Sequence, residues 1–216
     1  MGLGQTARWN AASDTGNANL EKHGVYELVP IIAVAAGQRV NGTQWVNKIK
    51  PDGTFKSRIV VDGWSQVPVF GGGGTFVPVC GRQGIRVMLA IATELDYEEF
   101  MLDVRMASLN ADVEEDVCVK MAVGHVLADK SGVPLVIILR NSLSGLRQSP
   151  NNWFDTMDNH LAKLEFRPLK SDHAFTYSRM TLTLTSLTLY VDDVPPLGAN
   201  MQLLNMLKKQ LMDRSR

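Results

Sequence analysis

Short apolar runs bounded by turn residues alternate along this chain with a few stretches of helical spacing. Residues 45–50 and 55–61 are strand-like runs on either side of Pro51-Asp52-Gly53-Thr54, and this arrangement predicts a β-hairpin. Runs of the same kind predict strands at residues 100–104, 133–139, 174–177 and 182–191, and a short strand ending near Pro30.

Helical spacing is clearest at residues 82–96, where apolar side chains recur every three or four positions. Ser149-Pro150 is typical of a helix start, with Ser149 as the N-cap and Pro150 at the first position. A last helix is predicted at residues 202–212, and residues 1–20 are expected to be frayed or weakly helical. Irregular alternation of helices and strands with antiparallel signals predicts an α+β fold.

Three aspartates lie at or just past the ends of predicted strands. Asp192 and Asp193 follow the run at residues 182–191, and Asp103 lies in the run at residues 100–104. Buried carboxylates are costly unless something pairs with them, and a divalent cation would do so. Neighbouring strand residues point to opposite faces, so Asp192 and Asp193 share a metal only if the chain turns there. The plainer interpretation is that these acids simply end strands at turns.

Four basic residues occupy the predicted hairpin. Lys48 and Lys50 share one phase of the first strand, and Lys56 and Arg58 share one phase of the second. An odd-length loop would unite the two pairs on one phosphate-binding face, whereas an even one would separate them. The alternative is an ordinary solvated hairpin.

Residues 143–150 are predicted to turn into the helix that begins near Ser149. A helix N-terminus attracts anions, and Arg147 lies close to it in sequence, although a plain capped helix start explains the pattern equally well. The four histidines form no ligand or triad pattern. Cys80 and Cys118 match neither a metal site nor a disulfide framework and fit a reducing compartment.

Bulk composition limits the remaining possibilities. The 216 residues carry zero formal net charge, so any contact with nucleic acid must come from a local basic patch. A hydrophobic content of 45% and a charged content of 20% are ordinary for a globular protein. No run has the apolar length of a membrane span, and none resembles a signal peptide.

Taken in order, six segments resemble the reverse transcriptase domain of copia-type LTR retrotransposons, from about residue 20 to the C-terminus. The segments are residues 21–30 (EKHGVYELVP), 45–60 (the hairpin), 75–79 (TFVPV), 102–110 (LDVRMASLN), 142–150 (SLSGLRQSP) and 190–193 (YVDD). Each match is modest, but six in the family's order are highly specific.

The resemblance implies the fingers and palm of a right-handed polymerase, with an antiparallel palm sheet backed by helices over residues 21–216. Asp103, Asp192 and Asp193 would be the catalytic residues and would hold two Mg²⁺ ions, with Mn²⁺ as a possible substitute. The expected activity is RNA-directed DNA polymerisation, which extends a DNA primer with dNTPs on an RNA or DNA template.

The resemblance also implies a substrate-binding set. Lys56 and Arg58 would grip the incoming triphosphate. The full set expected to contact substrate is Lys56, Arg58, Ser108, Ser144, Gly145, Arg147 and Gln148. Other expected partners are the ribonuclease H and integrase segments of the parent polyprotein, with no membrane partner, in a cytoplasmic virus-like particle.

Several residues depart from the family pattern. Ser108 replaces an aromatic residue expected beneath the sugar, and Ser144 replaces a tyrosine. Pro195-Pro196 falls where a strand should return, so that arm is expected to be displaced. The thumb and ribonuclease H regions are expected to be missing from this stretch.

Three hypotheses follow: an RNA-directed DNA polymerase domain that is active or formerly active, a decayed remnant that at most binds nucleic acid or metal, or an unrelated α+β interaction domain. We predict polymerase ancestry, with little or no activity for the isolated chain. Proximity of Asp103 to Asp192 would argue against the third.

Overall fold

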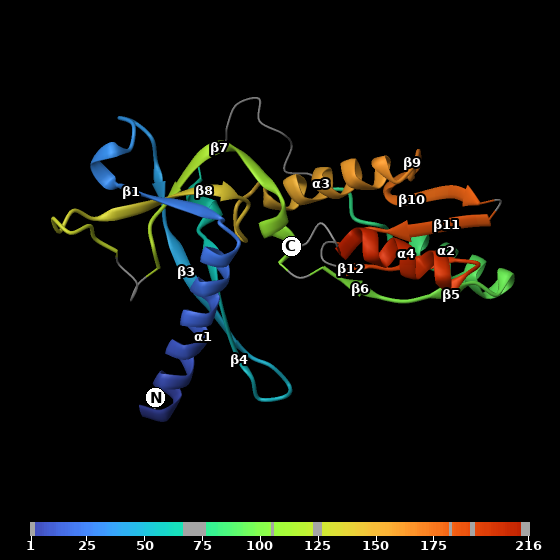
Figure 1. The fold of residues 1–216 in the computed structure, drawn as a ribbon, viewed down its shortest axis with the longest axis horizontal. Helices are drawn as coiled ribbons and strands as arrows, with labels where there is room; N and C mark the ends of the chain where they lie inside the picture. The colour runs from blue at the N-terminus through green and yellow to red at the C-terminus, as the bar shows by residue number, and fades with distance from the viewer. Residues whose placement is uncertain are drawn as a thin grey trace. The chain divides into compact units, whose positions relative to one another are not determined.

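The computed structural model describes residues 3–66, 77–104, 106–122, 127–181, 183–190 and 193–212. Helices and short, mostly antiparallel strands are mixed throughout these residues, and the α+β prediction is confirmed (Figure 1). The chain divides into two compact units. Unit 1 is Met1–Gly73 with Ala111–Asn152, and unit 2 is Gly74–Asn110 with Trp153–Arg216.

A four-stranded sheet forms the centre of unit 1, in the order β1-β8-β7-β2. Its strands are β1 (Tyr26–Pro30), β8 (Leu135–Asn141), β7 (Asp112–Val119) and β2 (Val40–Asn41). Only β2 runs parallel to its neighbour. Val25, Val119 and Val136 are almost fully buried, so this sheet carries the main apolar core of the unit. The short 3-10 helix η1 (Ile31–Ala33) follows β1.

The predicted hairpin is confirmed as β3 (Thr43–Ile49) and β4 (Phe55–Val61). A 20-residue helix, α1 (Leu3–Lys22), runs alongside it (Figure 1). The Trp9 and Phe55 rings meet edge to face at 4.5 Å, and the hydroxyls of Ser13 and Ser57 lie 3.1 Å apart.

Residues 1–20, expected to be frayed or weakly helical, lie largely within α1, which begins at Leu3. The stretch lacks a clear apolar face of its own, and its helix is stabilised by contacts with β4 that local sequence does not reveal.

Unit 2 is built on a five-stranded sheet in the order β5-β13-β11-β10-β9. The strands are β5 (Glu98–Glu99), β13 (Pro196–Gly198), β11 (Thr183–Thr188), β10 (Asp172–Thr181) and β9 (Arg167–Leu169). Two helices, α2 (Arg82–Leu95) and α4 (Met201–Met212), contact β13. Leu187, Leu197 and Leu204 are fully buried at this junction of sheet and helix.

Helix α3 (Ser149–Lys163) begins in unit 1 and continues in unit 2. The backbone N–H of Asn152 donates to the carbonyl of Gln148, so Gln148 holds the cap position and Ser149 is the first helical residue. The Ser149 cap prediction is thus wrong by one position, and the buried Ser149 hydroxyl has no hydrogen-bond partner. Boundaries of this kind depend on local capping geometry that sequence patterns resolve poorly.

The strand predicted at residues 100–104 is shorter than expected, as β6 (Leu102–Asp103), and most of the run predicted at residues 182–191 is β11. Asp193 lies in a further short strand, β12 (Asp193–Val194), which pairs with β6. After β12 the chain is interrupted at Pro195 and resumes as β13, where Pro196 is buried and lies opposite Leu187. The strand that returns after Asp193 is thus divided into β12 and β13, and each part is paired with another strand. Pro196 is tolerated because it is the first residue of its strand. Among the described helices, none combines the length and apolar character needed to cross a membrane.

Candidate active site

The acids of unit 2 meet across the β6–β12 pair. Asp193 lies directly opposite Asp103, and Val194 lies opposite Leu102. The two aspartates are exposed, whereas Leu102 and Val194 are buried, so this small ladder has one acidic, solvent-facing side and one apolar side. Because Asp103 and Asp193 are paired across the ladder and side chains alternate between its two faces, their carboxylates lie side by side although the residues are 90 positions apart in sequence.

The backbone hydrogen-bond pattern around Asp193 places its side chain especially close to that of Asp103. The N–H and the carbonyl of Asp193 are both engaged by Tyr190, with each N···O distance at 2.9 Å. Asp193 and Asp103 are therefore a non-hydrogen-bonded pair, in which Cα atoms lie about 4.5 Å apart and side chains approach most closely. Like charges directly opposite each other are destabilising. Among the described residues, no basic side chain forms an ion pair with either carboxylate.

This donor set fits a hard divalent cation, because carboxylate oxygens are the ligands that Mg²⁺ prefers. Asp192 lies outside the described residues, so its proximity to Asp103 is not tested. In the described part of the chain, no group of three or more His, Cys, Asp or Glu side chains is placed so that it could hold a metal ion together. The described residues thus supply two of the three expected ligands.

Ser108 lies shortly after Asp103, in the 3-10 helix η3 (Ala107–Asn110), and is half-buried. The preceding Met106 has φ 54°, and its carbonyl accepts a hydrogen bond from the Leu109 N–H at 2.8 Å. A left-handed conformation is uncommon for a methionine and marks a sharp change in chain direction. The left-handed turn at Met106 therefore sets the direction in which the backbone enters η3.

The register of the hairpin in unit 1 shows whether its four basic residues share one face. Lys48 lies opposite Lys56, and Val46 lies opposite Arg58. With side chains alternating along each strand, Lys48, Lys50, Lys56 and Arg58 all belong to one face, called here the cationic face. The odd-length loop accounts for this outcome.

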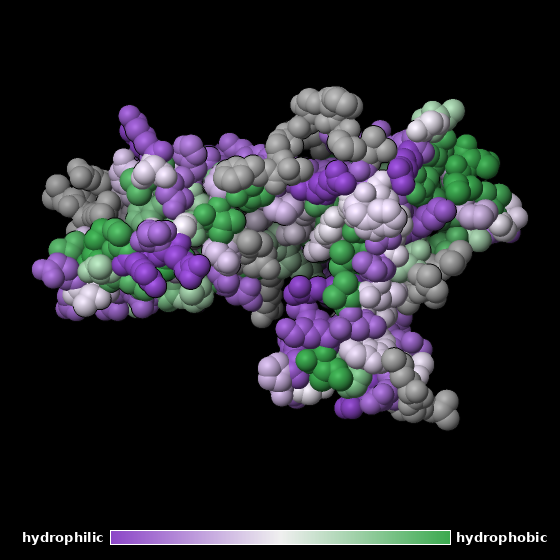
Figure 2. All heavy atoms as spheres, turned by 180° about the vertical axis from the view of Figure 1, so that it is seen from behind, coloured by the Kyte–Doolittle hydropathy of each residue, from purple (hydrophilic) through white to green (hydrophobic). Residues whose placement is uncertain are grey.

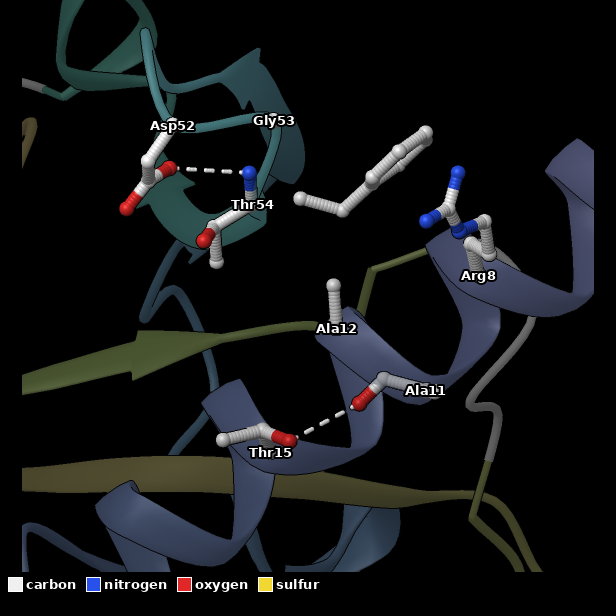
Figure 3. A pocket seen from close by; sticks show the side chains of 8 residues that line it. Arg8, Ala11, Ala12, Thr15, Asp52, Gly53 and Thr54 are labelled. Carbon is white, nitrogen blue, oxygen red and sulfur yellow. Dashed lines mark hydrogen bonds between the residues drawn. The ribbon is translucent and has the colours of Figure 1, made fainter.

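The opposite face of the hairpin is covered by α1. Gly16 lies so close to β4 that a Cβ atom there would be 3.2 Å from the Ser57 carbonyl oxygen. Where α1 meets the hairpin loop, an open hollow of ≈ 490 Å³ is lined by residues of both (Figure 3). Thr54 donates its backbone N–H to Asp52 at 2.9 Å, which lowers the Asp52 pKa and fixes the loop. Helix α1 thus packs on the face of the hairpin opposite the cationic face and does not cover the cationic face.

The turn at residues 144–148 packs against the end of β4. The Val61 N–H donates to the Ser144 carbonyl at 2.9 Å. At Gly145 φ is 96°, and an added Cβ would come within 2.5 Å of a Val60 methyl group. Because Val60 shares its strand phase with Lys56 and Arg58, this contact brings Ser144 and Gly145 to the cationic face.

Arg147 and Gln148 hold the loop that follows β4, which includes the 3-10 helix η2 (Gly63–Ser65). Arg147 donates its Nε–H to the Gly63 carbonyl at 2.8 Å and an Nη2–H to the Trp64 carbonyl at 3.3 Å. Gln66 donates to the Gln148 side chain at 2.7 Å. The expectation of substrate contact for Arg147 and Gln148 remains a prediction, and their observed contacts stabilise this loop.

Sequence reasoning missed Gln66 and Gly63. An added Cβ at Gly63 would lie 2.0 Å from the Gly145 carbonyl oxygen, so only glycine fits there. Both residues follow the predicted hairpin in a stretch without apolar period, and the local pattern contains no sign of contacts with residues 81 or 82 positions downstream.

Cys80 is a buried thiol of unit 2, near the start of α2. Its backbone N–H donates to the Leu189 carbonyl at 3.3 Å. Burial first, and then the neighbouring Asp172 carboxylate, raises the pKa of Cys80 to about 12. Burial also raises the pKa of Cys118. Both thiols are structural in character.

Comparison with known proteins shows which family this chain resembles. Residues 24–215 match the family described as reverse transcriptase (RNA-dependent DNA polymerase). The chain is 33% identical over 199 residues to the retrovirus-related Pol polyprotein from transposon TNT 1-94 of Nicotiana tabacum, covering 89% of this chain and 15% of that protein. It is 29% identical to the Pol polyprotein from transposon RE1 of Arabidopsis thaliana, covering 92% of this chain and 14% of the relative.

A yeast relative matches as well. The Ty1-DR5 Gag-Pol polyprotein of Saccharomyces cerevisiae is 30% identical over 181 residues, which are 80% of this chain and 10% of that protein. The chain therefore spans 15% or less of the length of these three relatives. With a family match over nearly the whole chain, the protein belongs to the reverse transcriptase (RNA-dependent DNA polymerase) family, in the form found in copia-type retrotransposons.

Proposed function

We propose that this chain is the fingers and palm part of an RNA-directed DNA polymerase, which extends a DNA primer with dNTPs on an RNA or DNA template. The observation that carries the proposal is the direct pairing of Asp103 with Asp193 on the exposed side of β6–β12. Two close carboxylates that have no cationic partner among the residues the structure describes form a natural ligand set for a divalent ion.

In this proposal unit 2 is the palm, and Asp103, Asp192 and Asp193 hold the metal ions. Two Mg²⁺ ions, when bound, would lower the barrier to attack by the primer hydroxyl and to departure of pyrophosphate. Leu102 and Val194, buried beneath the acids, keep the two carboxylates in register. The role of the protein is to fix these oxygens in place before substrate arrives.

Unit 1 is the fingers. Lys56 and Arg58 on the cationic face would bind the triphosphate, and Ser144, Gly145, Arg147 and Gln148 would border the same nucleotide. Arg58 is exposed, and its planar guanidinium suits forked contacts with phosphate oxygens. Ser108, small where the family has an aromatic residue, would weaken exclusion of ribonucleotides.

We further propose that residues 1–216 alone have little activity, with a decayed remnant as the second candidate. The small side chains of Ser108 and Ser144 favour the remnant, because each removes a nucleotide contact that the resemblance implies. The ribonuclease H and integrase segments of a parent polyprotein would be the other partners, since the relatives are Pol polyproteins far longer than this chain.

The test is primer extension on an RNA template with Mg²⁺ and then Mn²⁺, comparing the wild-type chain with Asp103→Asn and Asp193→Asn. Glu98→Gln, an exposed strand acid of the same unit, is the matched control. We expect weak extension that both aspartate variants lose and the control keeps. Extension retained by both aspartate variants would contradict the assignment, and no extension by a folded wild-type chain would favour the remnant.

Metal binding gives a readout that does not need activity. Asp193→Asn removes the repulsion with Asp103, so the metal-free variant should be more stable than wild type by about 0.5 kcal/mol. Mn²⁺ should raise the melting temperature of wild type but not of this variant. Differential scanning fluorimetry with and without Mn²⁺ measures both effects, and equal Mn²⁺ shifts in the two proteins would argue against a carboxylate metal site.

A further inference from the structure

Strand β1 is an outermost strand of the four-stranded sheet in unit 1, where it pairs with β8. Two hydrogen bonds show which of its backbone groups point to β8. The Arg140 N–H donates to the Val25 carbonyl at 2.7 Å, and the Ile31 N–H donates to the Pro134 carbonyl at 2.9 Å. Because the bonds of an antiparallel strand alternate in direction, residues 25, 27, 29 and 31 point to β8, and residues 26, 28 and 30 point away from it.

The outer edge of β1 therefore carries backbone groups that the sheet does not use. Tyr26 and Leu28 each direct an N–H and a carbonyl outward, whereas Pro30 has no N–H and directs only a carbonyl. Within the described residues, the N–H groups of Tyr26 and Leu28 donate no backbone hydrogen bond to another element. Unpaired donors and acceptors at a sheet edge are a template for pairing with a further strand.

The other edges of the two larger sheets are protected in the usual ways. Strands β2 and β5 have only two residues each, and both residues of β5 are glutamates. Strand β9 has three residues, which include Arg167 and Pro168. Strand β1 is longer, at five residues, and its central residue is Leu28, which is 41% exposed. Because proteins shorten, charge or interrupt the edges that must stay unpaired, β1 has the character of an edge that pairs.

The side chains around this edge are apolar. Leu28 is followed by Ile31 and Ile32 of η1, which are 37% and 80% exposed. Figure 2 shows hydrophobic side chains gathered at the surface over η1 (green, at the upper right). The one charged residue of β1, Glu27, forms an ion pair with Arg140 of β8. An apolar surface beside an unpaired edge is typical of a protein–protein contact.

We propose that a second copy of this chain pairs with β1 in antiparallel orientation, so that the four-stranded sheets of two copies become continuous. The pairing is centred on Leu28. Each Leu28 N–H donates to the Leu28 carbonyl of the other copy, and the two exposed leucines pack together. Each Tyr26 N–H meets the Pro30 carbonyl of the other copy, because a carbonyl oxygen can accept two hydrogen bonds.

Charge selects this register and this occupant. With Leu28 at the centre, Glu27 of each copy lies opposite the apolar Val29 of the other. A register centred on Glu27 would use the same N–H groups but place two glutamates directly opposite each other, which is destabilising. The edge is thus complementary to itself, as a two-fold interface requires. The proposal concerns unit 1 alone and is independent of the polymerase proposal.

Disulfide trapping in the full chain tests the register. Residues in a hydrogen-bonded antiparallel pair have Cα atoms about 5.5 Å apart, which suits a disulfide. Leu28→Cys should therefore form a covalent dimer under glutathione buffer, seen on a non-reducing gel. Ile32→Cys is the matched control, because position 32 is more exposed but does not lie opposite itself in the pair. Cross-linking of Leu28→Cys no faster than that of Ile32→Cys would overturn the inference.

Sedimentation equilibrium measures the association without a cross-link. The wild-type chain should dimerise reversibly with rising concentration. Leu28→Pro should dimerise about 10- to 100-fold more weakly than Leu28→Ala, because proline removes two intermolecular hydrogen bonds but none to β8. Circular dichroism checks that both variants fold. A wild-type chain that stays monomeric at every soluble concentration, or equal association of the folded proline and alanine variants, would contradict pairing through β1.

Discussion

Gly145 and Gly53 have left-handed backbones of similar φ, 96° and 79°, in opposite surroundings. A Cβ at Gly145 would lie 2.2 Å from the Val61 carbonyl oxygen, whereas nothing lies within 4 Å of one at Gly53. Gly145→Ala should therefore lower the free energy of unfolding by about 3–5 kcal/mol, from backbone strain and overlap together. Urea denaturation followed by circular dichroism measures the change.

Gly53→Ala is the matched control for that prediction. It introduces the same strain without the overlap and should cost about 1 kcal/mol. Equal losses in the two variants would mean that the turn at residues 144–148 does not pack against β4 as closely as the structure has it.

The buried thiols give a prediction about pH. Because the pKa of Cys80 is raised to about 12, only about one thiol in ten thousand is ionised at pH 8, and alkylation should be very slow in the folded chain. The neutral thiol stabilises the fold fully below the ordinary thiol pKa, and this contribution is lost progressively as pH rises above it. Ellman's reagent should label neither cysteine at pH 8 until denaturant is added, after which both react.

A rapid reaction of one thiol in the native chain would place that residue at the surface, contrary to the 3% and 1% exposure of Cys80 and Cys118. Cys118→Ala separates the two signals, since only Cys80 then remains to react.

At the scale of elements, α1 is a support for the hairpin. Trp9→Ala removes the ring packed on Phe55, which also lies beneath the Arg8 guanidinium at 4.8 Å. We expect a loss of about 2 kcal/mol, less than for a fully buried tryptophan because Trp9 is only half-buried. Hydrogen exchange should show faster opening of the amides of β3 and β4.

Asn10→Ala is the control for this helix, because Asn10 is exposed and alanine has the higher helix propensity. It should leave exchange in the hairpin unchanged or slightly slower. If Trp9→Ala and Asn10→Ala behaved alike, α1 would not be packed on the hairpin in solution.

At the scale of the whole molecule, zero net charge conceals a concentrated cationic face. If four cations on that face contact phosphates, the logarithm of the affinity for single strands should fall with the logarithm of salt with a slope of about −3. Lys48→Gln should make that slope shallower by about 0.7, because one fewer counterion is released. Titrations of oligo(U) at several salt concentrations measure the slope.

Lys130→Gln tests whether the effect is local. Lys130 is an exposed residue of unit 1 outside the hairpin, and its replacement should leave the slope unchanged. A uniform decrease for both lysine variants would indicate that binding depends on overall charge and not on the cationic face.

The sequence by itself determined the elements whose signals are local. The hairpin around Pro51-Asp52-Gly53-Thr54, the helix at residues 82–96 and the last helix are present almost as the pattern predicts, because turn residues and apolar spacing act within a few positions. The ordered motifs also determined the family, and they named Asp103 and Asp193 before either was placed.

Only the tertiary structure decided the rest. The polar stretch of α1 is a helix because β4 packs against it, and the acid-rich β7 is a strand because it pairs with both β8 and β2. Strand register decides that Asp103 lies opposite Asp193. It also decides that the four basic side chains of the hairpin share one face. Register arises from hydrogen bonds and side-chain packing between strands, and for the two acids these contacts join positions 90 residues apart, beyond the reach of any local pattern.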